Sequence, residues 1–469
     1  MLYRKGAVKG RVPNEIAKFT SSLNSDRRIA KATVKVVKAH VEHLCEIGVL
    51  KNNVCYEILA VLRDLEKNIL KNYPKEGFED VHEYIEYYVI EKLGEDLGGF
   101  INLGKSRNDQ VTTAIRLVLK EEILNVLNEI LSLQHSLLIK AKENIETIAL
   151  GYTHQQKAQV TTIAHHLLAY YDALNRDFER IIASLSRVDA SPLGASALTG
   201  NSIPGYDRSK VARKLGFSKI LENTEDAVAS RDYILEVMLN LTILMINISR
   251  FVEDLILWSM NELNYVIIPN NHAATSSIMP HKRNPVTLEV IRAKVAEILG
   301  YTVAACTLLK SLPYSYNLDL QELTPLLWKT IDITKESLSI LRDFIEKAKF
   351  NKERLMESIV RHLAMGFNDL AEYITLTYNV PFRKVHRILG ELSVNEKVNA
   401  AKIADTLREK LGIEISEKEI LNMLNFRELI LRRKVQGSPN FTEVKRMINE
   451  REIKLYEKKN IITKFQSKT

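Results

Sequence analysis

The segment from Ser276 to Pro285 carries side chains that could hold and deprotonate a carboxylic acid. It reads Ser-Ser-Ile-Met-Pro-His-Lys-Arg-Asn-Pro, so two hydroxyls, the ammonium of Lys282 and the amide of Asn284 occur within ten residues. Prolines interrupt regular structure, and the segment is therefore expected to be a loop. An ammonium and an amide can grip a carboxylate while a proton leaves the neighbouring carbon. The hydroxyl of Ser276 is the candidate base, on condition that cations and backbone N–H groups stabilise its alkoxide.

Two further segments carry side chains that could transfer a proton or bind a carboxylate. Residues 151–159, Gly-Tyr-Thr-His-Gln-Gln-Lys-Ala-Gln, contain His154, and imidazole is the side chain that most readily exchanges a proton near neutral pH. Residues 104–110, Gly-Lys-Ser-Arg-Asn-Asp-Gln, contain Arg107, whose guanidinium can bind a carboxylate with two hydrogen bonds. Each segment has a structural alternative, because a lone histidine is often a core residue and Ser-Arg-Asn-Asp is also a helix cap. Both alternatives stay open at this point.

These segments resemble motifs of the fumarase/aspartase superfamily. The loop matches Gly-Ser-Ser-x-Met-Pro-x-Lys-x-Asn-Pro, except that Thr275 replaces the leading Gly. Residues 104–110 and 151–159 are similar to the Gly-Arg-Ser-Arg-Asn-Asp-Gln and Gly-Tyr-Thr-His-x-Gln-x-Ala-Gln runs of argininosuccinate lyases, with Lys105 in place of the first Arg. The resemblance extends roughly over residues 15–440, because it includes residues 192–198 with Arg231-Asp232, and residues 381–383 with His386.

The resemblance implies a reaction and a set of residue roles. The reaction is the reversible β-elimination of argininosuccinate to fumarate and L-arginine, in arginine biosynthesis. Ser276 would be the base, His154 a partner in proton transfer that is hydrogen-bonded to Glu289, and Lys282 with Asn284 the clamp on the carboxylate. The residues implied to bind the rest of the substrate are Ser22, Arg107, Asn108, Thr153, Arg231, Tyr316 and Gln321. No cofactor and no metal are expected, since the chain has neither metal-ligand spacing nor a phosphate-binding glycine loop.

Two departures from the pattern leave other functions open. Thr324 stands where argininosuccinate lyases have a lysine that contacts the substrate. Residues 281–285, His-Lys-Arg-Asn-Pro, are more similar to the loop of adenylosuccinate lyases. Adenylosuccinate lyase, or another fumarate-releasing lyase, is therefore the alternative, although the run from Ser106 to Gln110 speaks against it. A third possibility is a non-catalytic structural protein on the same scaffold, as some lens crystallins resemble this family.

The spacing of glycine and proline predicts long helices. Neither residue occurs between Gly104 and Gly151, between Gly151 and Pro192, or between Gly216 and Pro269. A helix of 35 residues would be about 50 Å long, so several such helices imply an extended bundle. The expected fold is therefore all-α, and the resemblance implies a fumarase/aspartase-like form of it. Three domains are expected: an N-terminal domain at 1–109, a central bundle of long helices at 110–360, and a small helical domain at 361–469. One short strand is expected within 264–268, and the tail from Lys458 is expected to fray.

Residues 234–246 bear on the assembly of the protein. They are apolar on nearly every face, so their helix must be enclosed by other helices, from one chain or from several. Asn108, His154 and Ser276 lie next to different long helices, and the ends of such helices are far apart. The resemblance implies a homotetramer in which each active site takes segments from three subunits.

Composition also bears on the kind of substrate and on the location of the protein in the cell. The 66 Lys and Arg exceed the 58 Asp and Glu by a net charge of +8, which suits a small anionic substrate or is simply a basic surface. No nucleic-acid-binding module occurs. The three cysteines, Cys45, Cys55 and Cys306, have no paired spacing and are interpreted as reduced core residues of an intracellular, cytoplasmic protein. No secretory signal is expected, and residues 237–249 are too short and too polar to span a membrane.

Overall fold

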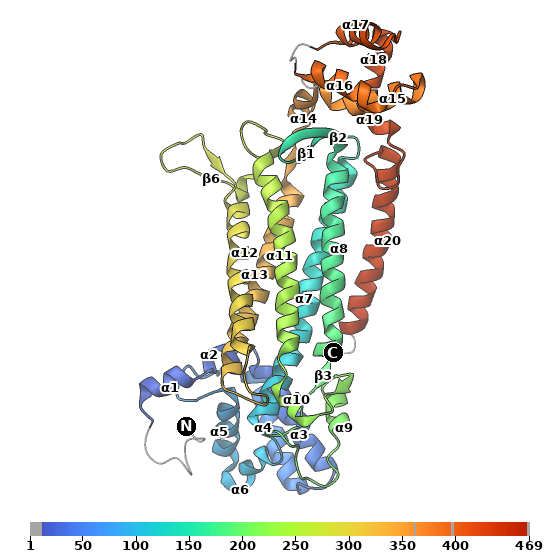
Figure 1. The fold of residues 1–469 in the computed structure, drawn as a ribbon. Coiled ribbons are helices and arrows are strands. Elements are labelled where there is room, and N and C mark those ends of the chain that lie inside the picture. Colours follow the sequence, from blue (N-terminus) through green and yellow to red (C-terminus); the bar gives the residue numbers. More distant parts are fainter. Residues whose placement is uncertain (1–11, 361–362, 395–397, 467–469) are drawn as a thin grey trace.

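The computed structural model describes residues 12–360, 363–394 and 398–466, and it is a long bundle of helices (Figure 1). The N-terminal elements are α1 (Asn14–Thr20), α2 (Leu23–Asp26), α3 (Ala30–Glu46), α4 (Asn52–Asn68), α5 (Val81–Leu93), α6 (Glu95–Gly98) and η1 (Gly99–Asn102). The long helices are α7 (Arg107–Glu143), α8 (Ile163–Val188), α11 (Asp232–Trp258), α12 (Val286–Leu309), α13 (Asp319–Lys347) and α20 (Phe441–Gln466). The prediction of an all-α fold is therefore confirmed.

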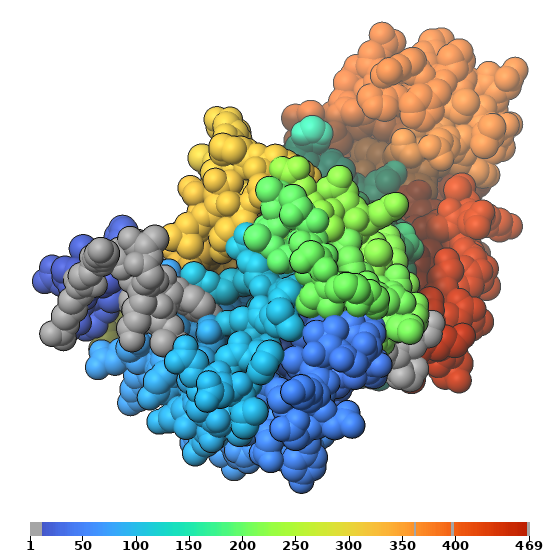
Figure 2. Space-filling view, turned by 90° about the horizontal axis from the view of Figure 1, so that it is seen from below, coloured from blue at the N-terminus to red at the C-terminus, as the bar shows by residue number. Residues whose placement is uncertain are grey.

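Short elements connect or cap the long helices. Between them lie α9 (Arg208–Lys214), α10 (Thr224–Ala229) and η2 (Asn270–His272). The C-terminal region contains α14 (Lys352–Val360), η3 (Leu363–Gly366), α15 (Phe367–Tyr378), α16 (Phe382–Ser393), α17 (Ala400–Leu411), α18 (Glu417–Met423) and α19 (Phe426–Arg432). In Figure 1 the N-terminal helices lie at one end of the bundle and α15–α19 at the other, and Figure 2 looks onto the N-terminal end.

Helix α7 sets the length of the bundle. Its 37 residues correspond to about 55 Å. It begins with a capping box, in which Ser106 Oγ accepts from Asn108 N at 3.3 Å and Asp109 Oδ1 accepts from Ser106 N at 3.0 Å. The rest of the helix packs against α8, α13 and α20 through buried leucines and isoleucines. Residues at the start of α7 are thus held far from the segment that follows its end.

Helix α11 is the strongly apolar helix that the sequence indicates. It packs against α8, α12 and α13, yet three of its large apolar residues, Leu239, Ile243 and Ile246, remain 39–46% exposed. On α12, Val290, Leu299 and Val303 are also exposed. The prediction that residues 237–249 are too short and too polar to span a membrane does not extend to the whole of α11. This helix has 27 residues, and by length and composition alone it could cross a membrane, as core helices of soluble proteins also could. One chain therefore leaves an apolar strip on α11 and α12 uncovered.

The described strands form four two-stranded sheets. These pair β1 (Ile148–Thr153) with β2 (Gln156–Thr162), β3 (Ala190–Ser191) with β4 (Lys219–Ile220), β5 (Val266–Ile267) with β8 (Lys349–Phe350), and β6 (Ala274–Thr275) with β7 (Arg283–Asn284). The strand expected within 264–268 is confirmed as β5. The prediction that the window from Gly151 is helical is wrong for its first twelve residues, because they belong to the β1–β2 hairpin and α8 begins only at Ile163.

The C-terminal segments reach both ends of the bundle. Helices α15–α18 share a small core of their own, which includes Leu370, Ile374, Val385 and Ile403. Helix α20 then runs back along α7, and its Lys458 is buried with its ammonium on the side-chain oxygen of Asn175. The expectation of a frayed tail is therefore wrong as far as Gln466, and residues 467–469 lie outside the described residues. The boundaries near residues 109 and 360 stay a prediction.

The interpretation of all three cysteines as reduced is wrong. Cys45 and Cys55 form a disulfide, with their Cα atoms 5.9 Å apart, while Cys306 is free. Cys45 lies in the last turn of α3 and Cys55 in the first turn of α4. The two helices fold back on each other at Gly48, whose φ of 73° suits glycine. Two cysteines whose spacing in the sequence gave no sign of pairing are thus bonded in the fold. The cysteines therefore no longer argue for an intracellular protein.

Reduction of this disulfide should destabilise the N-terminal region. The bond closes a loop with a sequence separation of 10, which corresponds to about 2–3 kcal/mol by loop-closure entropy. We expect wild type to unfold at a lower urea concentration with a reductant than without it, and Cys55→Ala to unfold at the lower value in both conditions. Cys306→Ala is the matched control and should keep the response to reductant. Equal midpoints for wild type in both conditions would contradict the pairing.

Candidate functional site

The loop that carries Ser276 extends outward from the bundle between β6 and β7 (Figure 1). The two strands pair Ala274 with Asn284 and Thr275 with Arg283, so the loop runs from 276 to 282. The guanidinium of Arg283 fixes its base by donating to Ile268 O at 2.9 Å and to Asn270 Oδ1 at 2.8 Å. Residues 277–282 are exposed, as is Glu289 in the first turn of α12. The loop is therefore anchored at its base and open to a partner at its tip.

Ser276 accepts two hydrogen bonds from the backbone of its own loop. The N–H of Ile278 lies 3.3 Å and that of Met279 3.1 Å from Ser276 Oγ. Both donors would stabilise negative charge on this oxygen, which meets part of the condition set for a serine base. Lys282 and Asn284 lie on the same loop and its closing strand, so an ammonium and an amide are available nearby in the sequence.

His154 lies at the tip of the β1–β2 hairpin. Strand residues Thr153 and Gln156 pair with each other, so His154 and Gln155 form a two-residue turn. Their φ angles are 53° and 57°, in the left-handed region that non-glycine residues rarely adopt. The turn exposes the imidazole and the side chain of Thr153 to solvent. Strained backbone of this kind, held by a rigid hairpin, often occurs at functional sites.

The remaining candidate residues meet at the opposite end of the bundle, beside the start of α7. A cavity of about 80 Å³ there is lined by Ser22, Arg107, Asn108, Arg231, Tyr316 and Gln321, together with Asp26, Glu79, Asp80, His82 and Thr324. Ser22 precedes α2 and Asp26 ends it, and Asp80 and His82 lie at the start of α5. Tyr316 precedes α13, and Gln321 lies in its first turn. The structure thus brings these six predicted residues to one cavity.

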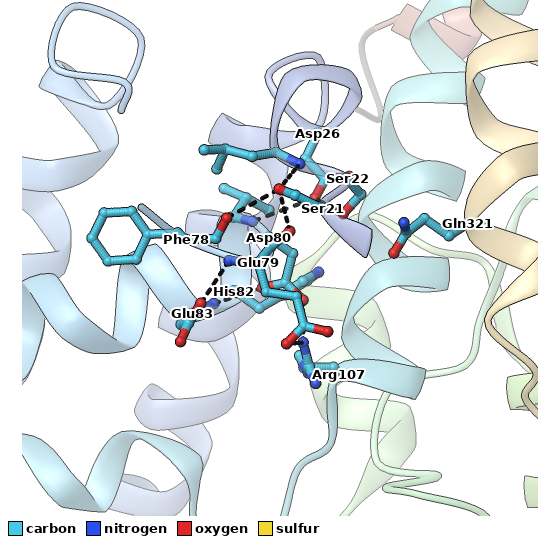
Figure 3. A network of polar contacts seen from close by, with 12 residues as sticks. Ser21, Ser22, Asp26, Phe78, Glu79, Asp80, His82, Glu83, Arg107 and Gln321 are labelled. Atoms are coloured by element: carbon cyan, nitrogen blue, oxygen red, sulfur yellow. Dashed lines mark hydrogen bonds and ion pairs between the residues drawn. The ribbon is translucent and has the colours of Figure 1, made fainter. Parts of the chain in front are cut away.

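Hydrogen bonds within the described residues fix most of this cavity's wall (Figure 3). Arg107 donates to Asp80 Oδ2 at 2.5 Å and lies 3.5 Å from Glu79. Asn108 Nδ2 donates to Ala197 O at 3.0 Å, and Gln321 Nε2 donates to Thr20 O at 3.2 Å. Arg231 is buried and donates to the carbonyls of Val228 and Ser230, while its Nε has no partner among the described residues.

Burial changes the protonation of several groups around the cavity. It raises the pKa of Asp26 to about 7 and lowers the pKa of His82 to about 4, so His82 is neutral near pH 7. His82 Nδ1 lies 3.2 Å from Gln110 Oε1 and donates to it. Burial also raises the pKa of Tyr316. The acids that line the cavity are therefore Glu79, Asp80 and a partly protonated Asp26, and the cations are Arg107 and Arg231.

Two aspartates of this region were not predicted from the sequence. Asp109 accepts from Gly194 N and Ser196 N, both at 2.9 Å, in addition to the cap of α7, so it fixes the segment after β3 next to Asn108. Burial raises its pKa to about 6. The capping box was a sequence signal for Asp109. Asp26 had no such signal, because only the folded chain brings it to the cavity.

The structure thus divides the candidate residues between two ends of one bundle. Arg107 and Asn108 begin α7, whereas His154 follows its end, about 55 Å away along the helix axis. Ser276, Lys282, Asn284 and Glu289 lie at the same end as the hairpin, on the outward loop and the start of α12 (Figure 1). Another cavity, of about 1090 Å³, lies between the hairpin and the C-terminal helices, and Thr153 is the one candidate residue in its lining.

Comparisons with known proteins identify the family of this chain. Residues 6–300 match the sequence profile of the lyase family. The chain is 37% identical to argininosuccinate lyase of Methanosarcina mazei, over 97% of this chain and 93% of that protein, and 40% identical to argininosuccinate lyase of Methanothrix thermoacetophila, over 95% and 92%.

Solved structures show the same fold. An EDDS lyase variant with bound fumarate superposes with a TM-score of 0.83 at 22% identity, over 99% of this chain and 94% of that chain. Class II fumarase from Schistosoma mansoni superposes with a TM-score of 0.73 at 19% identity, over 85% and 90%. With relatives this similar over nearly its whole length, the chain is a lyase that belongs to the argininosuccinate lyase family of the fumarase/aspartase superfamily.

Proposed function

We propose that this protein converts argininosuccinate reversibly to fumarate and L-arginine, as a step of arginine biosynthesis in the cytoplasm. The observation that carries the proposal is the identity of 36–40% to argininosuccinate lyases over almost the full length of both chains. The Ser-Arg-Asn-Asp-Gln run at the start of α7 supports this substrate over other succinyl compounds. The net charge of +8 favours a small anionic substrate.

In the proposed mechanism the alkoxide of Ser276 takes the proton from the carbon next to a substrate carboxylate. The electron pair moves into that carboxylate, and Lys282 with Asn284 stabilises the added charge. The C–N bond then breaks, fumarate forms, and the departing nitrogen receives a proton through His154, directly or through water. The two N–H groups at Ser276 Oγ, at 3.1 and 3.3 Å, support the choice of base. Glu289 would orient His154. The reaction as written uses no cofactor and no metal.

We assign the complete site to three subunits of a homotetramer. The distance of about 55 Å along α7 supports this, because no rotation of side chains joins Arg107 and Asn108 to His154 within one chain. The uncovered apolar strip on α11 and α12 supports it too, since such a strip is typical of a subunit interface. A second subunit would then supply the outward loop with Ser276, and a third the cavity around Ser22 and Arg107.

Fumarate release from two substrates tests the proposed function. Purified protein with argininosuccinate should give rising ultraviolet absorbance from fumarate, and with adenylosuccinate it should give none. Release from adenylosuccinate alone would move the protein to the alternative suggested by residues 281–285. No release from either substrate would favour a structural protein on the same scaffold.

A further inference from the structure

A hydrogen bond between two tyrosines joins the hairpin that carries His154 to the rest of the bundle. Tyr152 lies on β1, two residues before His154, and its Oη is 3.0 Å from Oη of Tyr265. Among the described residues of β1, Tyr152 is the one nearest the turn whose side chain hydrogen-bonds to another element. Residues 153–157, beyond it, are exposed. The position of the imidazole therefore depends on how firmly Tyr152 is held.

A bulge separates the turn from the buried base of the hairpin. At the base, Leu150 pairs with Val160, and each is 2% exposed. Beyond this pair the register shifts, because Gly151 alone opposes Ala158 and Gln159. A Cβ atom on Gly151 would lie 3.0 Å from Gln159 O, so glycine permits the close approach of the two strands. A bulge disrupts the ladder and bends its strand, and the apolar base therefore does not fix the turn by itself.

Tyr265 is a firmly held partner for Tyr152. It is 2% exposed, its N–H donates to Trp258 O at 2.8 Å, and its carbonyl accepts from Asn351 N at 2.9 Å. Its ring packs edge-on against the indole of Trp258, with the ring centroids 6.4 Å apart. Since Trp258 ends α11, the hydrogen bond between the tyrosines ties the strand before the turn to a long helix of the bundle.

Burial sets the direction of this hydrogen bond. Buried polar groups are nearly always hydrogen-bonded, and among the described residues Tyr152 Oη is the partner of the Tyr265 hydroxyl. Tyr265 therefore donates and Tyr152 accepts. The O–H of Tyr152 is left for the cavity of about 1090 Å³ that this residue lines, where solvent can accept it. Burial also raises the pKa of Tyr152, so its phenol stays protonated near neutral pH.

We propose that Tyr152 and Tyr265 are positioning residues that hold His154 where it can transfer a proton to the departing nitrogen. The turn itself contains His154 and Gln155 at positive φ, so its conformation depends on the strands that hold it. A displacement of about 1 Å can cost a hundredfold in rate when a reacting group must be in line. This inference rests on the proposed function, in which His154 transfers a proton, and extends it to two residues behind the turn.

Phenylalanine substitutions test the proposal, because each removes one hydroxyl and keeps the ring. We expect Tyr152→Phe and Tyr265→Phe each to lower kcat for fumarate release about ten- to a hundredfold, and to change KM by less than about threefold. The double variant should lose no more than the single ones, because all three break the same bond. In a His154→Asn background, where fumarate is collected over hours, Tyr152→Phe should cause no further loss, since the pair acts through the imidazole.

The direction of the bond predicts an order of stability that differs from the order of the rates. Tyr152→Phe leaves the buried O–H of Tyr265 without an acceptor, whereas the double variant leaves no unpaired group. In urea, Tyr152→Phe should therefore unfold at a lower concentration than the double variant, although the two have the same kcat. A higher midpoint for Tyr152→Phe would contradict the direction assigned to the bond.

Tyr170→Phe is the matched control. Tyr170 lies on α8, and its hydroxyl donates to Asp254 Oδ2 at 2.6 Å, away from the hairpin. This variant should keep kcat within about twofold of wild type. A loss as large as that of Tyr152→Phe would overturn the role of the pair.

Two further results would also overturn this role. One is a kcat within twofold of wild type in both Tyr152→Phe and Tyr265→Phe, and the other is a further loss in the His154→Asn background. If Tyr152→Phe does not fold, as judged by circular dichroism, the same measurements on Tyr265→Phe decide. A wild type that releases no fumarate would instead contradict the proposed function, and with it the role given to His154.

Discussion

Replacing Ser276 by alanine should lower kcat by about two to four orders of magnitude, the contribution expected of a positioned base. The backbone N–H groups of Ile278 and Met279 would then point at a methyl group, because the hydroxyl that accepts their hydrogen bonds is removed. The loop is anchored at its base by Arg283, so the substitution should not change its path. Fumarate release gives kcat, and light scattering gives the mass of the assembly, which should equal that of wild type.

Ser277→Ala is the control for this variant. Ser277 is the next residue of the loop and is exposed, and none of the described hydrogen bonds directs backbone donors at its hydroxyl. It should retain turnover that is readily measured. A Ser276→Ala enzyme with a normal rate would remove Ser276 as the base. Equal losses in both variants would mean that the loop needs both hydroxyls, and would contradict a special role for the first.

The long helices could be predicted from the sequence because they depend on local properties. Glycine and proline are absent from α7, and Ser106 and Asp109 provide a cap that can be read directly. The hairpin that carries His154 could not be predicted in this way. Its turn contains His154 and Gln155 at positive φ without a glycine, so the usual turn signal is missing. What determines it is the pairing of β1 with β2, and the composition of 156–162 also suits a helix.

The wall of the cavity depends on contacts that are distant in the sequence. Ser22 was predicted through resemblance alone. Asp26 was not predicted, because its carboxylate is held at the cavity by the N–H of Val81, which is 55 positions away in the sequence. The same reason explains the missed disulfide, since Cys45 and Cys55 meet only when α4 folds back on α3. Residue types and motifs thus predict the chemistry, and tertiary contacts determine which groups surround the predicted residues.

Mixing two inactive variants should restore activity if the sites are shared. His154→Asn and Ser276→Ala each remove one group that the proposed mechanism requires. In the proposed tetramer these groups reach one site from different subunits, so some sites of a mixed assembly contain neither substitution. With random exchange at equal amounts the chance is one half for each group, and about one quarter of the wild-type rate should return. A site built within one chain would stay inactive in every mixed assembly.

The exchange of subunits between the two variants must be verified before this result can be interpreted. Isotope labelling of one variant allows mass spectrometry to count mixed assemblies, and each variant taken alone through the same treatment gives the background rate. Wild type mixed with the double variant, His154→Asn with Ser276→Ala, checks that exchange itself preserves active sites. The decisive measurement is the rate of fumarate release by the mixture of the two single variants. A rate near one quarter of wild type is the predicted result, and no recovery above background in verified mixed tetramers would contradict shared active sites.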